Sequence, residues 1–159
     1  MAIPSLDALT RNNYGGDDTG LICGYRFSGT EPPQEVDTAA ALQWLAEGEG
    51  SQGFVWLHFN LAHAAATRWL ERHANLPPEF HEALQGGVHS TRIERTDDAL
   101  VAVVNDVNFD FDFEPSDIAT LYVAVTGRLV VSARRKALRS IDRLRADVRR
   151  GLPLRSSVE

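Results

Sequence analysis

The stretch FVWLHF, residues 54–59, is apolar except for His58. A short, continuous apolar run that contains aromatic and β-branched residues is typical of a central strand buried on both faces of a sheet. A histidine inside such a strand is expected to be a hydrogen-bonded core residue rather than a metal ligand. We therefore place the middle of a sheet at residues 54–59.

Two elements are expected before this strand. An apolar and aromatic segment at residues 21–27 predicts a first strand. A short helix follows, since Asp37 or Thr38 can cap its first turn and Gly48 and Gly50 can end it. Because a helix separates the two strands, we expect them to be parallel.

The chain after residue 59 predicts helices first, then two hairpins and a last helix. The expected elements are a helix over about 63–75 with Leu61, Ala65 and Trp69 on its apolar side, a helix from Pro78 to Gly86, strands over 91–96 and 99–109, strands over 118–125 and 128–133, and a helix over 136–150. This order predicts an α/β fold in which helices pack against a mixed parallel and antiparallel sheet.

Length and composition limit the class of protein. The chain has 159 residues, which suits one domain, and residues 1–20 look like a loose arm before it. The net charge of −6 argues against a nucleic-acid-binding protein. The single cysteine, Cys23, excludes an internal disulfide and a multi-cysteine zinc site. No apolar stretch reaches the about 18 residues of a membrane-spanning helix, so we expect a soluble chain.

The charges are strongly separated along the sequence. Residues 96–127 contain seven acidic residues and no lysine or arginine, whereas residues 128–150 contain nine basic residues and two acidic ones. Arg135, Arg139 and Arg143 are spaced to share one face of the last helix. That face is expected to be solvated or to contact another subunit, and a basic helix beside an acidic strand could dock head-to-tail in a ring.

The acidic part supplies the only candidates for metal binding. In an extended strand, side chains alternate, so the acidic residues from position 106 would lie opposite the phenylalanines. Carboxylate oxygens are ligands for hard divalent cations, although a solvated strand face explains the same pattern. The candidate metal ligands are Asp106, Asp110, Asp112, Glu114 and Asp117.

No motif supports an enzyme. The chain lacks a Gly-x-Ser-x-Gly nucleophile turn, a phosphate-binding Gly-Lys-Ser/Thr loop and a dinucleotide-binding Gly-x-Gly-x-x-Gly turn. The five histidines have no zinc-binding spacing, and Cys23 lies in an apolar strand where a thiol is unreactive. We predict no catalytic residues and no cofactor other than a divalent cation.

An ordered set of segments resembles a known family. The set consists of Phe54-Val-Trp-Leu-His-Phe59, Leu76-Pro77-Pro78, Thr91-Arg-Ile-Glu-Arg95, and Leu121 followed by Gly127-Arg-Leu-Val-Val-Ser132 and Arg134. Between about residues 21 and 151 the chain resembles the N-terminal cytoplasmic domain of CorA-type divalent-metal transporters, and within them the ZntB zinc-transporter branch.

The resemblance implies an α/β/α sandwich at residues 21–151 that forms a homopentamer on the cytoplasmic side of the cell membrane and regulates transport of zinc or magnesium. It also implies that residues 152–159 link to a stalk and membrane helices outside this chain, so that the chain is a fragment lacking the pore, and a monomer or dimer in isolation. The acidic residues would concentrate cations. The alternatives are a stand-alone cation-sensing or interaction module of the same fold, and an acid-rich hydrolase.

Overall fold

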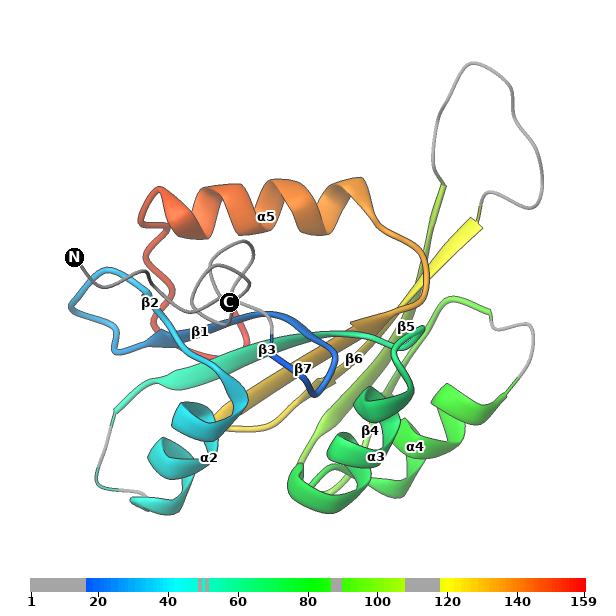
Figure 1. The fold of residues 1–159 in the computed structure, drawn as a ribbon, viewed down its shortest axis with the longest axis horizontal. Coiled ribbons are helices and arrows are strands. Elements are labelled where there is room, and N and C mark those ends of the chain that lie inside the picture. The colour runs from blue at the N-terminus through cyan, green and yellow to red at the C-terminus, as the bar shows by residue number, and fades with distance from the viewer. Residues whose placement is uncertain (1–16, 49, 51, 87–89, 108–117) are drawn as a thin grey trace, which may run out of the picture.

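The structure, a computed structural model, describes residues 17–48, 50, 52–86, 90–107 and 118–159. In these residues the strands form one mixed seven-stranded sheet, in the order β2-β1-β3-β7-β6-β5-β4 (Figure 1). The strands are β1 (Leu21–Phe27), β2 (Gln34–Glu35), β3 (Phe54–Asn60), β4 (Arg92–Arg95), β5 (Leu100–Val107), β6 (Ile118–Val125) and β7 (Leu129–Arg134). β3 lies between β1 and β7, and its residues 54–59 are all buried, so the predicted central strand is confirmed.

Helices cover both faces of the sheet (Figure 1). α2 (Thr38–Ala46), α3 (Ala64–His73) and α4 (Pro78–Gln85) pack on one face, and α5 (Arg139–Arg149) packs on the other. The side chains of β3 alternate between the two resulting cores, with Val55 and Leu57 in the first and Phe54 and Trp56 in the second. The fold is therefore the expected α/β/α sandwich.

The direction of the first two long strands was predicted wrongly. β1 and β3 are antiparallel, with Phe27 opposite Phe54. The cause is β2, which pairs antiparallel with β1 and reverses the chain before α2 begins. α2 then returns the chain to the end of the sheet where β1 finished, so β3 must run the opposite way. The parallel pair is β3 with β7, where Val55 lies opposite Leu129.

The helix boundaries follow local capping and burial. Of the two candidate caps for α2, Asp37 is the one used, since its side chain accepts a hydrogen bond from Ala40 N at 2.8 Å. Near α3 the predicted apolar side is confirmed at Leu61 and Trp69, which are buried, but not at Ala65. Ala66 and Leu70 are buried and Ala65 is only partly so, because turning Leu70 inward removes more apolar surface from water.

α5 begins three residues later than expected. Leu138 is extended and buried in the second core, so the chain crosses onto this face of the sheet before the helix starts. After the helix, Leu152 and Leu154 pack against the same core. At the other end of the described chain, Asp17 Oδ2 accepts a hydrogen bond from Thr38 N at 3.0 Å, which ties residue 17 to α2.

Candidate functional site

The predicted metal ligands fall mostly outside the described residues. Asp106 is placed on β5 opposite Ala119, half-buried on the side of the sheet that carries α5. Ser140 Oγ donates a hydrogen bond to Asp106 Oδ2 at 2.9 Å, which joins β5 to the first turn of α5. Asp110, Asp112, Glu114 and Asp117 lie outside the described residues. Over the part that is described, no three His, Cys, Asp or Glu side chains come together as a metal site.

The basic residues of the last helix fall into two groups: one contacts the edge of the sheet, and the other is exposed to solvent. Arg149 faces the sheet edge, where its Nε donates to Tyr25 Oη at 3.2 Å and lies 3.8 Å from Glu35 Oε1. Arg139 and Arg143 are exposed and one helical turn apart. The expectation that Arg135 shares their helical face is wrong, because Arg135 precedes α5 and its guanidinium donates to Leu61 O at 3.5 Å.

His58 is the buried core histidine that the sequence predicted. It is 2% exposed, and its Nδ1 lies 2.7 Å from Ser132 Oγ, which also accepts a hydrogen bond from Trp56 Nε1 at 2.8 Å. The Ser132 hydroxyl can accept from the indole and donate to a neutral imidazole at once. Burial, reinforced by the positive charges of Arg134 and Arg145, lowers the pKa of His58 to about 3.

Neither this histidine nor the cysteine beside it has the properties of a reactive group. Burial raises the pKa of the Cys23 thiol to about 11, so the thiol stays protonated at neutral pH. Ser132 is 3% exposed. The Ser132–His58 contact therefore satisfies polar groups inside the second core.

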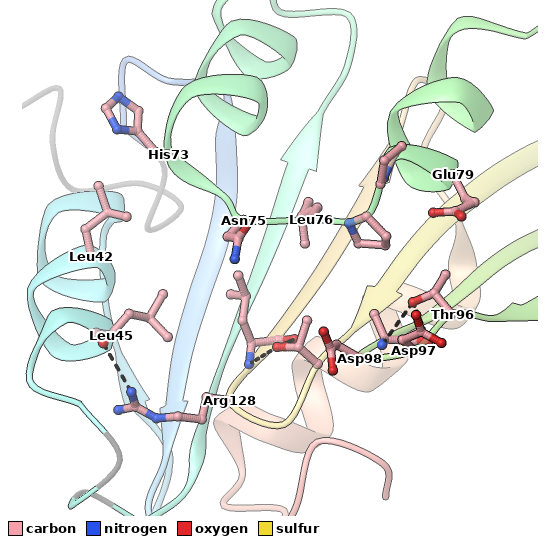
Figure 2. Close-up of a pocket in the computed structure, with 15 residues that line it drawn as sticks. Leu42, Leu45, His73, Asn75, Leu76, Glu79, Thr96, Asp97, Asp98 and Arg128 are labelled. Carbon is pink, nitrogen blue, oxygen red and sulfur yellow. Dashed lines mark hydrogen bonds between the residues drawn. The ribbon is translucent and has the colours of Figure 1, made fainter.

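A hollow of about 630 Å³ opens at the end of the sheet where the hairpin turns lie (Figure 2). We name it the hairpin groove. Its apolar lining comes from Leu42 and Leu45 of α2 and from Leu76, and its acidic lining from Glu79, Asp97 and Asp98. The sequence indicated Asp97-Asp98 only as a turn, because nothing local shows that α2 and α4 approach the same turn.

Arg128, predicted only as the start of a strand, forms one wall of the hairpin groove (Figure 2). Its guanidinium donates to Leu45 O at 3.1 Å and to Trp44 O at 3.3 Å, and its Cζ lies 4.3 Å from the centre of the Trp44 ring. These carbonyls belong to the last turn of α2, where a positive charge is favoured. Arg128 therefore fastens α2 to the β6–β7 turn. The acidic side chains of the hairpin groove lie on other elements, with Glu79 on α4 and Asp97 and Asp98 between β4 and β5.

Known proteins share this sequence and fold. The chain is 27% identical over 128 residues to the zinc transport protein ZntB of Pectobacterium carotovorum, a match that covers 79% of this chain and 39% of that protein. It is 29% identical over 96 residues to ZntB of Yersinia pestis, covering 60% of this chain and 29% of that protein. The chain thus spans well under half of the length of these curated relatives.

Solved structures agree on the fold. The full-length CmaX protein superposes with a TM-score of 0.73 at 25% identity, covering 89% of this chain and 43% of CmaX. The ZntB cytoplasmic domain of Vibrio parahaemolyticus superposes with a TM-score of 0.63 at 17% identity, covering 86% of this chain and 52% of that domain. Among the helices that the structure describes, none combines the length and apolar character needed to cross a bilayer.

The family itself is recognised over most of the chain. The family described as "CorA-like Mg2+ transporter protein" matches residues 51–158, which run from the start of β3 through α5 to the last residues. This region contains the central strand, both hairpins and the basic helix, and the match extends over more than half of the sequence. The chain therefore belongs to the family of CorA-like Mg²⁺ transporter proteins.

Proposed function

We propose that this chain is the cytoplasmic, regulatory domain of a membrane transporter for divalent metal ions, zinc or magnesium. The observation that carries the proposal is the family match over residues 51–158. It is supported by relatives that are zinc transport proteins and by the shared fold with a ZntB cytoplasmic domain. The family is one of metal-ion transporters and not of enzymes, so we assign no catalytic residue.

In this proposal the acidic segment acts on cations. Residues 96–127 carry seven carboxylates and no basic side chain, so their field raises the local concentration of divalent cations. Asp106, Asp110, Asp112, Glu114 and Asp117 are the proposed contacts, with carboxylate oxygens as the ligands that Mg²⁺ accepts and that Zn²⁺ also tolerates. Here the metal ion is the cargo or the signal of the transporter.

The proposed surroundings follow from the family. The domain would lie on the cytoplasmic side of the cell membrane and assemble with further copies of itself as a homopentamer. Contact with the membrane would come from helices outside the 159 residues. Nucleic acid is not a proposed partner, in keeping with the net charge of −6.

Metal uptake by cells tests the proposed transport function. We would delete the codons for residues 21–151 from the natural gene and measure zinc and magnesium uptake with isotopic tracers. The expected result is loss of uptake, or loss of its response to metal supply. Unchanged uptake and response for both metals would contradict the proposed function.

The acidic segment is tested separately by calorimetric titration of the chain with Zn²⁺ and Mg²⁺. Asp110→Asn/Asp112→Asn should weaken binding, and Glu71→Gln/Glu82→Gln, with the same charge change at exposed sites on α3 and α4, should not. If both double variants bind metal like the unaltered chain, the acidic segment is not the cation contact. That outcome would leave the uptake experiment to decide the transporter assignment.

A further inference from the structure

The hairpin groove combines apolar and acidic lining, and the guanidinium of Arg128 in its wall is directed to the carbonyls and the Trp44 ring of α2. Leu42, Leu45 and Leu76 offer apolar surface, while Glu79, Asp97 and Asp98 bring carboxylates to the same hollow (Figure 2). Asp97 and Asp98 are exposed and form no ion pair with any described residue. Glu79 Oε2 is buried, yet no described atom donates a hydrogen bond to it. The groove is therefore suited to a cationic group attached to an apolar stem.

The exposed side of α5 has that chemistry. Arg139, Arg143 and Arg150 are exposed and recur at helical spacing on one side of the helix, with Ala146 between them. Arg143 makes no ion pair or hydrogen bond with a described residue. An arginine side chain covers apolar surface with its methylene stem while its guanidinium reaches a carboxylate. We call this side of α5 the basic face.

The two surfaces cannot meet within one molecule. The hairpin groove lies in the layer of α2 and α4, and α5 lies on the opposite face of the sheet (Figure 1). A contact between them must therefore join two copies of the chain. Each copy would use its groove toward one neighbour and its basic face toward the other, which is a head-to-tail arrangement.

We propose that the basic face of α5 in one copy docks into the hairpin groove of the next copy, with Arg143 and Arg139 opposite Asp97, Asp98 and Glu79. A head-to-tail contact of this kind builds a ring if the rotation between copies closes, and a filament if it does not. This inference deepens the proposed function, because it names the surfaces through which the domain would meet its own copies. The contact requires neither metal nor membrane. The contact can therefore be refuted while the transport assignment stands, and the transport assignment can be refuted while the contact stands.

Two charge-reversal variants test the contact by complementation. The helix variant, Arg139→Glu/Arg143→Glu, keeps an intact groove, and the groove variant, Asp97→Lys/Asp98→Lys, keeps an intact basic face. Arg68→Glu/Arg72→Glu on the exposed side of α3 is the control with an equal charge change to that of the helix variant. Circular dichroism and thermal melting confirm that each variant is folded before it is used.

Sedimentation velocity at low salt then distinguishes the outcomes. The unaltered chain and the control should associate and dissociate in 0.5 M salt, while each reversal variant should associate about 100-fold more weakly. An equimolar mixture of the two reversal variants should associate again, because the intact groove of one variant meets the intact basic face of the other and the two reversed surfaces also carry opposite charges. A chain that stays monomeric up to about 1 mM, variants that assemble like the unaltered chain, or a mixture that does not associate would each overturn the proposal.

Discussion

Protonation of His58 makes stability depend on pH in a window that the structure sets. The neutral ring is buried at 2% exposure against Ser132, with Arg134 and Arg145 as the charged groups that act on it. Its pKa falls from 6.5 to about 3 on folding, so the unfolded chain binds the proton first as the pH drops. The contribution of the neutral ring is complete above pH 6.5 and is lost as the pH falls toward 3.

The size of this effect follows from the two pKa values. Each unit of difference corresponds to about 1.4 kcal/mol, which gives about 5 kcal/mol over the whole range and about 2 kcal/mol between pH 7 and pH 5. The range from pH 7 to pH 5 lies above the usual titration range of carboxylates, and comparison with a His58 variant over this range isolates the contribution of His58. His58→Asn keeps an acceptor near the position of Nδ1 and cannot gain a proton.

Urea unfolding at pH 7, 6 and 5, followed by tryptophan fluorescence, measures the effect. The free energy of unfolding of the unaltered chain should fall by about 2 kcal/mol more than that of His58→Asn over this range. The lower starting stability of the variant does not matter, because only the change with pH is compared. Equal pH dependence in the two proteins would refute the reasoning, since it would mean that His58 keeps its ordinary pKa in the folded chain.

Three further substitutions probe the packing that the structure shows, each read out by urea or thermal unfolding. Ser132→Ala removes the partner of both Trp56 Nε1 and His58 Nδ1 and should cost about 2–5 kcal/mol; a loss under about 0.5 kcal/mol would mean that these atoms find other partners. Gly53→Ala places a methyl group 1.8 Å from Phe27 O at a backbone φ of +102° and should cost about 3 kcal/mol or more, whereas Gly127→Ala, where the space is open, should cost far less. Arg128→Met removes two hydrogen bonds and the ring contact that fasten α2, and should cost about 1–3 kcal/mol, with Arg155→Met as an exposed-tail comparison.

Local patterns were enough to locate the secondary structure. The strands at 21–27, 54–59 and 118–125 and the helix that Pro78 begins were predicted within a residue, because alternation, apolar runs and capping residues act over a few positions. The buried state of His58 was predicted on the same basis. The ordered set of such segments also sufficed for the resemblance to the family that the comparisons confirm.

Strand direction and the hairpin groove depended on contacts distant in sequence. β2 is two exposed residues, Gln34 and Glu35, and no local pattern distinguishes them from a loop, yet their pairing with β1 reverses the chain. The parallel partner of β3 is β7, more than 70 positions away, so no local pattern could indicate it.

The candidate sites likewise combine features that local sequence shows with features that depend on contacts distant in sequence. Charge could be located without a structure, because it is a property of composition: acidic residues accumulate at 96–127 and basic residues at 128–150. The grouping of Glu79, Asp97 and Asp98 in one groove, and the position of the exposed α5 arginines on the other face of the sheet, depend on the tertiary fold. The physical reason is that a turn, a helix start and a distant helix come together only when both cores close, and that closure depends on the summed packing of the whole chain rather than on any single segment.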